Sequence, residues 1–275
     1  MSPISAPTTT PYSLGSSDPE IARLDTQAEF LTLPTRALLQ ASGLKPGMRV
    51  LDLGTGLGHV ARAVAEIVGP QGEVVGLDSS PRMLEVAASR VDSPPQVRYV
   101  EGDVTAWRDD EPFDAVVGRL ILFHLPDPVA TLRHHLEGVR PGGRLVALDY
   151  DIGAVRAEPG DRLSEPLRDL ILAAFRAAGA DPTIGSRVKQ HLRSAGVEDV
   201  GGFGIGQYIA HDDPVGPVMV AGVVRSLLPV ILGHGLATEE EVDIDTLQGR
   251  VAASLSEHDS ALVPPMLVGA WGTRR

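Results

Sequence analysis

Short apolar runs alternate with amphipathic segments over residues 49–148, and this alternation constrains the fold more than any other feature. Five runs have the length and composition of buried strands: residues 49–53, 73–77, 97–100, 113–117 and 144–148. Three intervening segments place apolar side chains at helical spacing: residues 60–68, 81–91 and 128–136. Strands that alternate with helices in this way pair in parallel through right-handed crossovers. The sequence therefore predicts an α/β fold with a doubly wound, mostly parallel sheet.

The alternation becomes irregular after residue 151. Helices are expected over residues 164–178 and 186–194, and strands over residues 202–209 and 266–271. More than fifty residues of mostly helical pattern separate these two strands, which suggests an insertion that covers the active face. The expected organisation is an N-terminal arm, flexible over residues 1–15, with a lid helix (1–40), a ligand-binding core (41–154), a helical insertion (155–182), a core helix and strand (183–208), a helical substrate lid (209–262) and a last core strand (263–275).

Several helix starts are marked by capping residues. Ser80 and Asp127 each precede a proline, which favours the first turn of a helix. Ser164 is a further candidate cap, and Thr238 with Glu241 has the spacing of a capping box. These signals place helices after the second and fourth strands and within both insertions.

Composition excludes several classes of function. The 275 residues contain no cysteine, which rules out disulfides, a zinc–cysteine site and a thiol nucleophile. The formal net charge is −12 with both signs mixed along the chain, whereas binding nucleic acid needs clustered lysine and arginine. The eight histidines are scattered without metal-ligand spacing. We therefore expect a small-molecule partner, no nucleic acid and no metal; the sequence leaves a homodimer open.

No targeting or membrane segment is expected. The N-terminal residues MSPISAPTTTPYSLGSS lack both a basic leader and an apolar stretch, so they do not resemble a secretory signal. The most apolar later stretch, residues 218–232, contains Gly222, Arg225, Ser226 and Pro229 and is predicted to be too short and broken to span a bilayer. A cytoplasmic location is the expectation.

The segment LDLGTGLGH, residues 51–59, carries the clearest functional signal. Gly54, Gly56 and Gly58 lie where a strand turns into a helix, a position that needs positive φ and close approach of the backbone to a ligand. The dinucleotide pattern G-x-G-x-x-G would require glycine at position 59, which is histidine here. The loop therefore predicts a nucleotide site of another kind.

Carboxylates lie at or just after the ends of the first three strands. Asp52 would oppose a pyrophosphate, but it suits the ammonium and sulfonium charges of S-adenosylmethionine, directly or through water. Asp78 lies 20 residues after Gly58, where it can accept hydrogen bonds from both ribose hydroxyls. Asp103 can accept from the adenine amino group, and Met83 and Val104 can sandwich the ring. For each carboxylate a helix cap or a solvated turn is the structural alternative.

Residues from about 12 to 150 resemble the class I S-adenosylmethionine-dependent methyltransferases, in particular the small-molecule branch that acts on quinones and natural products. The stretches that carry the resemblance are LDLGTGLGH, VVGLDSSPRML, VEGDV, FDAVVGRLILFHL and VRPGGRLVALD, in that order, and the later IGSRVKQHLRSAGV and LVGAWGTRR are similar to bacterial members. Residues 155–182 and 209–262 match weakly, as expected of a divergent substrate-binding region. The resemblance implies a Rossmann-like sheet of seven strands, the last antiparallel, and methyl transfer from S-adenosylmethionine.

The resemblance also assigns roles to residues. It implies a glycine loop, ribose and adenine contacts, a strand end beside the methionine part of the cofactor, and a tyrosine in the arm that folds over it. The expected cofactor-binding residues are Tyr12, Asp52, Gly54, Thr55, Gly56, Gly58, Asp78, Ser79, Met83, Gly102, Asp103, Val104, Gly118 and Arg119. An aromatic ring near a sulfonium would gain a cation–π contact.

Methyl transfer needs a base only if the acceptor is a hydroxyl, a protonated amine or an acidic carbon. His124 follows the fourth strand at the carboxyl edge of the sheet, where ligands of open α/β sheets bind. Asp151 ends the fifth strand at the same crevice. We predict these two as catalytic residues, with a packing or capping role as the alternative for each.

Three other functions fit the sequence less well. A protein of this fold can bind S-adenosylmethionine and catalyse a different reaction, such as a cyclisation. A dehydrogenase that uses NAD is disfavoured by Asp52 and by the glycine spacing. A pure binding module does not explain the acidic crevice and the lid-like insertion.

Overall fold

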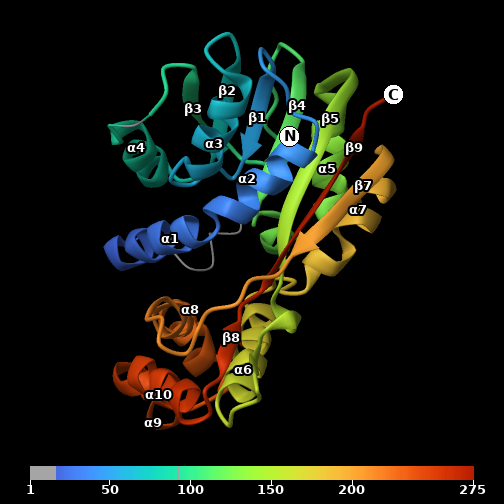
Figure 1. Cartoon of the computed structure of the whole chain (residues 1–275). Coiled ribbons are helices and arrows are strands. Elements are labelled where there is room, and N and C mark those ends of the chain that lie inside the picture. The colour runs from blue at the N-terminus through green and yellow to red at the C-terminus, as the bar shows by residue number, and fades with distance from the viewer. Residues whose placement is uncertain (1–16, 92) are drawn as a thin grey trace, which may run out of the picture.

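Seven strands form one sheet in the order β3-β2-β1-β4-β5-β9-β7 in the computed structural model, which describes residues 17–91 and 93–275 (Figure 1). The strands are β1 (Arg49–Leu53), β2 (Glu73–Asp78), β3 (Val97–Glu101), β4 (Phe113–Arg119), β5 (Val139–Asp151), β7 (Glu198–Ile205) and β9 (Met266–Thr273). Strands β1 to β5 pair in parallel, and β9 is antiparallel to both β5 and β7. The predicted doubly wound sheet with an antiparallel last strand is confirmed.

The strand order places the helices on both faces of the sheet. The chain moves from β1 towards β3 and then, from β4, in the opposite direction, so right-handed crossovers put α3 and α4 on one face and α5 on the other. The helices of the core are α2 (Thr32–Ala41), α3 (His59–Val68), α4 (Pro81–Ser89), α5 (Pro128–Glu137) and α7 (Val188–Ser194). The order reverses between β1 and β4, and ligands of such sheets bind at this point.

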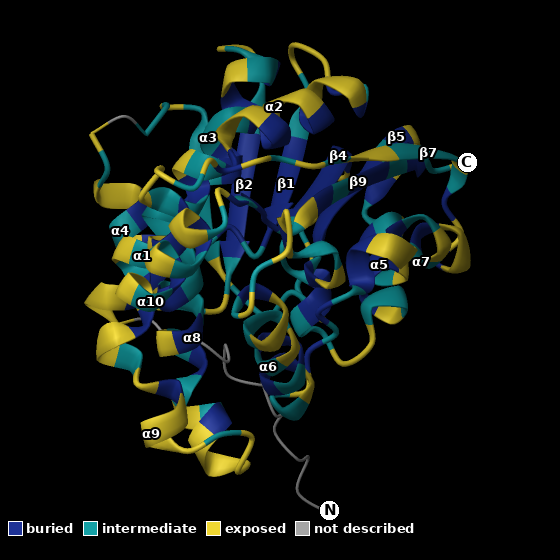
Figure 2. Ribbon diagram, turned by 60° about the horizontal axis from the view of Figure 1, so that its bottom comes forward, coloured by how far each residue is buried: buried dark blue, intermediate teal, exposed yellow. Residues whose placement is uncertain are grey.

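The central strands are buried on both faces, as Figure 2 shows for β1, β2 and β4. In β4 the six residues before Arg119 are all buried. Burial on both faces explains why these strands are continuous apolar runs rather than alternating ones. It also means that a polar side chain within such a strand lies in the core unless it comes at the strand end.

The capping signals have mixed outcomes. Ser80 and Asp127 accept hydrogen bonds from the backbone amides of Met83 and Ala130, and Thr238 with Glu241 forms the complete capping box. The prediction for Ser164 is wrong, because Leu163 is the N-cap and Ser164 is the first helical residue. The strand expected over residues 202–209 is β7, which both begins and ends four residues earlier than predicted.

The two insertions form one lid beyond the carboxyl ends of the strands (Figure 1). We use "lid" for α6 (Ser164–Ala177), α8 (Val215–Gly233), α9 (Glu239–Val242), α10 (Ile244–Glu257) and the strands β6 (Arg156–Glu158) and β8 (Ala261–Val263). Strands β6 and β8 pair antiparallel, so the first insertion is joined to the end of the second. The sequence did not predict this small sheet, because three-residue strands have no readable period.

Helix α8 corrects the expectation for residues 218–232. It runs unbroken through 19 residues despite Pro229, because its buried residues pack against α6 and α10. Among the described residues it is the one helix that is long and apolar enough to cross a membrane by length and composition, with mean hydropathy 2.0. A third of that window (33%) is buried inside the protein.

Candidate active site

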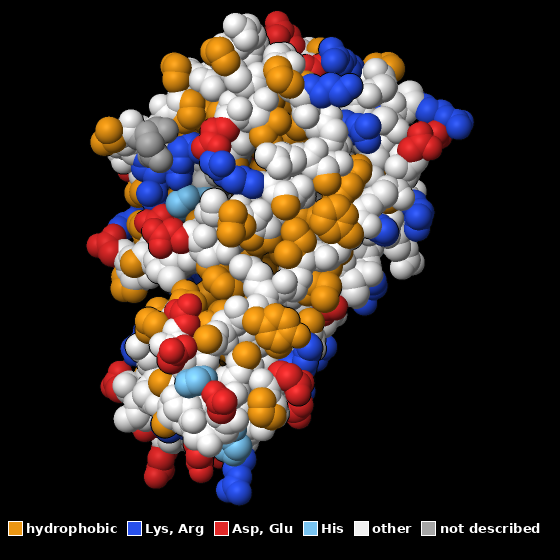
Figure 3. All heavy atoms as spheres, in the orientation of Figure 1, with side chains coloured by type: hydrophobic (Ala, Val, Ile, Leu, Met, Phe, Trp, Pro, Cys, Tyr) orange, Lys and Arg blue, Asp and Glu red, His pale blue; other side chains and the backbone are white. Residues whose placement is uncertain are grey.

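A cavity of about 1030 Å³ lies between the carboxyl ends of the parallel strands and the lid. The glycine loop after β1, the helix α1 (Asp18–Phe30), the ends of β4 and β5, and the lid helices α6 and α8 line it. Figure 3 shows hydrophobic side chains gathered along the seam between the core and the lid. Single-ligand pockets have volumes of roughly 300–1,000 Å³, so this one has room for a nucleotide cofactor and a second small molecule.

The glycine loop has the backbone that its sequence predicts. Gly54, Gly56 and Gly58 have φ values of +64°, +50° and +74°, and a Cβ at Gly56 would meet only open space. The carboxylate of Asp78 holds this loop by accepting hydrogen bonds from the amides of Gly56 (2.8 Å) and Ser80 (2.9 Å). The burial of Asp78 raises its pKa. The loop, with Asp78 at its edge, faces the cavity.

Asp52 has a different place from the one expected. It is 1% exposed, does not line the cavity, and accepts a hydrogen bond from the hydroxyl of Thr55 at 2.7 Å. Burial raises its pKa to about 7, while the Thr55 hydrogen bond and the charge of Arg119 act in the opposite direction. Asp52 therefore supports the glycine loop from behind, and its direct contact with the cofactor is not supported.

The side of the cavity assigned to adenine contains Met83, Asp103 and Val104. Asp103 also accepts hydrogen bonds from the amide and hydroxyl of Thr105, both at 2.8 Å. Asp103 therefore both stabilises its own turn, which was the structural alternative, and lines the cavity as a ligand-binding residue would. The carbonyl of Val104 is bonded to a ring nitrogen of His135 at 2.6 Å, which fixes the backbone at this wall.

The structure brings most of the predicted residues to one cavity. Those that line it are Gly54, Thr55, Gly56, Asp78, Ser79, Met83, Asp103, Val104, Arg119 and His124. Those that do not are Asp52, Gly58, Gly102, Gly118 and Asp151. Tyr12 lies outside the described residues. The glycines of the second group lie close to side chains: a Cβ at Gly58 would meet Tyr99, one at Gly102 would meet Trp107, and one at Gly118 would meet Ile121.

Helix α1 covers the glycine loop and is held there by ion pairs. Asp25 contacts His59 at 2.8 Å and Arg90 at 2.6 Å, and Asp18 pairs with Arg82. Burial lowers the pKa of His59 to about 4, so its ring is neutral at pH 7 and bonds to Asp25 without a full charge. The single lid helix expected within residues 1–40 is two helices, α1 and α2, which are separated at Leu31.

The other half of the cavity is apolar. Phe123 follows β4 and meets Phe175 of α6 edge-on, with 5.6 Å between the ring centroids. The further apolar residues that line this half include Leu125, Ile152, Val155, Ile171, Met219 and Leu262. Several come from the two divergent insertions, which is where substrate-binding residues were expected.

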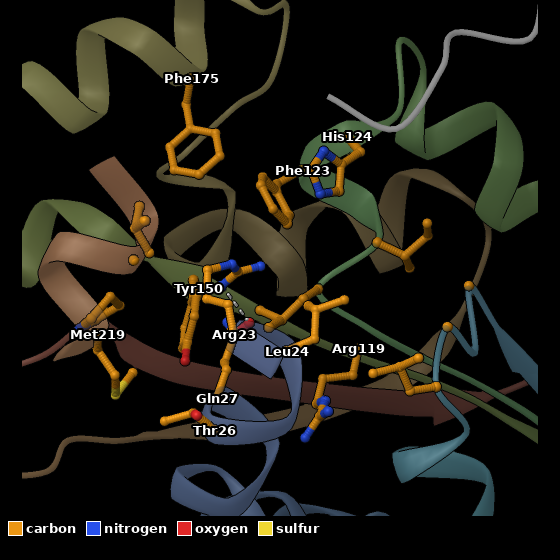
Figure 4. Close-up of a pocket in the computed structure, with 18 of the residues that line it drawn as sticks. Arg23, Leu24, Thr26, Gln27, Arg119, Phe123, His124, Tyr150, Phe175 and Met219 are labelled. Atoms are coloured by element: carbon orange, nitrogen blue, oxygen red, sulfur yellow. Dashed lines mark hydrogen bonds between the residues drawn. The ribbon is translucent and has the colours of Figure 1, made fainter. Parts of the chain in front are cut away.

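Three polar residues in this region were missed by the sequence reasoning. Arg23 and Gln27 project from α1, and Tyr150 lies in β5 directly before Asp151 (Figure 4). A guanidinium nitrogen of Arg23 donates to the side-chain oxygen of Gln27 at 3.1 Å. Arg23 and Gln27 are four residues apart, so the sequence places them on one face of a helix. The neighbouring sequence does not show that this face meets the cavity.

His124 and Asp151, the two predicted catalytic residues, lie in different surroundings. His124 lines the cavity, and burial followed by the charge of Arg23 lowers its pKa to about 3. Asp151 does not line the cavity; its carboxylate accepts a hydrogen bond from the amide of Gly153 at 3.1 Å and caps a short turn. The capping alternative therefore describes Asp151, while a base role for His124 stays a prediction.

The pKa of His124 leads to a test of that role. The imidazole is neutral across physiological pH but too weak a base to hold a proton, so the rate of any assigned reaction should show no histidine inflection between pH 5 and 8. We expect His124→Ala to lower turnover by less than the roughly 10²–10⁴-fold that general-base catalysis contributes. Turnover against pH, with the cofactor dissociation constant measured in parallel, checks this. A larger loss at unchanged cofactor affinity would identify His124 as the base.

The strand-order reversal, the glycine loop and a carboxylate that lines the cavity beside it are typical of a nucleotide-binding α/β protein, and comparison with known proteins shows what the chain is similar to. Residues 50–143 match the family model described as a methyltransferase domain. The ubiquinone/menaquinone biosynthesis C-methyltransferase UbiE of Ectopseudomonas mendocina is 33% identical over 144 residues, which are 51% of this chain and 54% of that protein. The trans-aconitate 2-methyltransferase of Rhizobium leguminosarum is 34% identical over 151 residues, 55% of this chain and 52% of that protein. The chain thus spans about half the length of these relatives.

Solved structures share the fold. The YcgJ protein of Bacillus subtilis aligns over 88% of this chain and 98% of its own, with TM-score 0.56 and 17% identity. Phosphoethanolamine N-methyltransferase 2 of Haemonchus contortus, in complex with S-adenosyl-L-methionine, aligns over 88% of this chain and 52% of its own, with TM-score 0.53 and 21% identity. These structures share the fold of this chain, and its residues 50–143 match a methyltransferase domain.

The residues present fit S-adenosylmethionine. Gly56 leaves open space at the loop, Asp78 presents a half-buried carboxylate to the same cavity, and Met83 and Val104 supply apolar surface for a ring. Arg119, whose guanidinium donates to Thr35 at 2.9 Å, offers positive charge for a carboxylate. One cavity thus holds donors and acceptors for a nucleoside at one end and for an amino acid at the other.

Proposed function

We propose that this protein transfers a methyl group from S-adenosylmethionine to an oxygen, nitrogen or carbon nucleophile of a small, largely apolar acceptor. The observation that carries the proposal is the continuity of one cavity from the glycine loop and Asp78 to the apolar compartment under the lid. The named methyltransferase relatives support methyl transfer over another reaction such as a cyclisation. The net charge of −12 favours a small-molecule acceptor over a nucleic acid.

The chain's own residues bind and orient. The glycine loop and Asp78 hold the nucleoside, Met83 and Val104 flank its ring, and Arg119 faces the amino-acid end. When bound, the cofactor supplies a methyl group activated by the positive charge of its sulfonium. The protein then contributes mainly by holding the two reacting molecules in line and by excluding water beneath the lid, and orientation of this kind accounts for a large part of a displacement rate.

A labelled-methyl assay tests the proposal. The protein is incubated with S-adenosylmethionine labelled in its methyl group and with a panel of apolar phenols, carboxylic acids and amines, and the products are extracted into organic solvent. We expect label in the organic phase with at least one acceptor, and much less with the Asp78→Ala variant when S-adenosylmethionine is kept near the dissociation constant of the unmodified protein. Cofactor binding without label in any product would favour a non-methylating reaction such as a cyclisation. That alternative gains support if an acceptor is converted equally fast with S-adenosylhomocysteine in place of S-adenosylmethionine.

A further inference from the structure

A group of polar side chains marks the boundary between the cofactor end and the apolar end of the cavity. Arg23 and Gln27 come from α1, Arg119 from the end of β4, His124 from the turn after β4, and Tyr150 from β5 (Figure 4). We call these five residues the polar cluster. They lie close enough for both arginines to act on Tyr150, and Arg23 also acts on His124.

The charge of the polar cluster is positive. The carboxylates among the described lining residues are Asp78, Asp103 and Asp245. The first two belong to the nucleoside end, and Asp245 lies on α10 with its side chain 88% exposed. Glu20 pairs with Arg23 and Asp52 acts on Arg119, but both carboxylates lie behind the wall of the cavity. A ligand group at the polar cluster therefore meets two guanidiniums and no lining carboxylate.

Tyr150 supplies a proton donor at the same place. The residue is 8% exposed, and its hydroxyl oxygen is buried with no hydrogen bond of normal geometry to any described residue. The amide of Gln27 lies near enough to act on the hydroxyl, but burial is the larger effect and raises the pKa of Tyr150, so the proton is retained. A buried hydroxyl without a hydrogen bond of normal geometry is costly, and a ligand that accepts its proton in a well-aligned hydrogen bond removes that cost.

We propose, on the basis of the proposed function, that the acceptor reacts through an anionic oxygen (a phenolate, an enolate or a carboxylate on an apolar body) and that this oxygen accepts a hydrogen bond from Tyr150 beside Arg23 and Arg119. An amine is a poorer occupant, because its nitrogen gains positive charge as it is methylated, next to two guanidiniums. Tyr150 is thereby an acceptor-binding residue that selects the nucleophile.

The chemistry balances without a base. The anionic oxygen of the acceptor forms the new carbon–oxygen bond as the methyl carbon–sulfur bond breaks, and the electron pair of that bond stays on sulfur. The negative oxygen and the positive sulfonium become a neutral ether or ester and a neutral thioether. No proton has to be removed during the step, which agrees with a cavity whose two described lining histidines, His59 and His124, have pKa values lowered by burial to about 4 and about 3, and from which Asp151 is absent.

Two probes of nearly equal shape test the inference. 4-Nitrophenol ionises near neutral pH and its anion is coloured, whereas 4-nitroaniline stays uncharged. With the full chain and S-adenosylhomocysteine present, we expect 4-nitrophenolate to bind about tenfold more tightly than 4-nitroaniline, and binding to shift the ionisation of 4-nitrophenol towards the anion, as a hydrogen bond to a charged group allows. The preference of the unmodified protein is informative even if a variant does not fold.

The variant Tyr150→Phe removes the hydroxyl and keeps the ring. It should raise the dissociation constant of 4-nitrophenolate about tenfold, leave that of 4-nitroaniline nearly unchanged and abolish the spectral shift. Tyr208→Phe is the matched control, because Tyr208 is 69% exposed and does not line the cavity, and it should change neither probe. Equal binding of both probes, binding of neither, or an equal loss of both in Tyr150→Phe would overturn the inference.

Cofactor binding is measured separately in the same samples. If S-adenosylhomocysteine binds but the probes show no preference, the anionic-oxygen assignment is wrong and the proposed function stands. If S-adenosylhomocysteine does not bind, the proposed function fails. Binding of the two probes to the protein without cofactor then decides the anionic-oxygen assignment by the same criteria.

Discussion

Asp149→Ala should lower the free energy of unfolding by about 3–5 kcal/mol, because it removes a buried acceptor from several backbone amides at once. Asp149 is 0% exposed in β5, and its carboxylate accepts hydrogen bonds from the amides of Leu122 and Tyr150, both at 3.0 Å. The bond from Leu122 attaches the turn that carries Phe123 and His124 to β5, the strand that carries Tyr150. Loss of both bonds leaves the amide groups buried without partners. Urea denaturation of both proteins measures the difference.

Asp151→Ala is the matched control for this prediction. Asp151 lies two residues along the same chain, is partly exposed and caps a single amide, so its loss should cost about 1 kcal/mol. A loss at Asp151 as large as that at Asp149 would contradict the account given for both carboxylates. Turnover of Asp151→Ala near that of the unmodified protein would also exclude a catalytic role for Asp151.

The pKa of Asp149 adds a pH dependence to the same experiment. Burial raises its pKa to about 7 from 3.8, so between these two pH values the folded protein holds a proton that the unfolded chain releases. The stability due to this proton is fully present below pH 3.8 and is lost as the pH rises to about 7. The difference in unfolding free energy between the protein and Asp149→Asn should therefore be larger at pH 5 than at pH 8. A difference that grows with pH would contradict this sign.

The parts of the structure that are determined locally could be predicted from the sequence. The strand–helix alternation, the glycine loop and the capping of α4 depend on residues within a few positions of one another, and the structure has them as expected. Asp78 lines the cavity as predicted, because the carboxyl end of a parallel strand faces the crevice irrespective of how the insertions fold. Asp52 was not, because it lies within β1, where side chains turn into the core.

The polar cluster could not be predicted, because its members meet only through tertiary packing. Arg23 and Gln27 reach the cavity because α1 docks on the glycine loop through Asp25, and nothing in the sequence of α1 identifies His59 and Arg90 as the partners of Asp25. The lid presents the same difficulty. Strands β6 and β8 are three residues each and about a hundred residues apart, so their pairing is set by the fold and not by a pattern.

Asp78→Ala should weaken the binding of S-adenosylhomocysteine by about 1.5–3 kcal/mol, or roughly 10- to 150-fold in the dissociation constant. Two effects add. The variant removes the acceptor predicted for the ribose hydroxyls, and it releases the amide of Gly56, whose hydrogen bond to Asp78 fixes the glycine loop, together with the amide of Ser80 in the turn after β2. Isothermal titration calorimetry with the full chain gives the change directly, and a melting curve shows whether the loop alone has been disturbed.

Asp103→Ala is the comparison that separates these causes. Asp103 also lines the cavity, but its carboxylate bonds only within its own turn, to Thr105, and supports no part of the glycine loop. It should therefore weaken cofactor binding less than Asp78→Ala does, by about 1 kcal/mol for one exposed acceptor. Asp78→Asn should fall between the two, because its amide keeps one acceptor oxygen but cannot accept from both Gly56 and Ser80. An unchanged dissociation constant in Asp78→Ala would remove the ribose assignment, and with it the main support for a nucleoside at this end of the cavity.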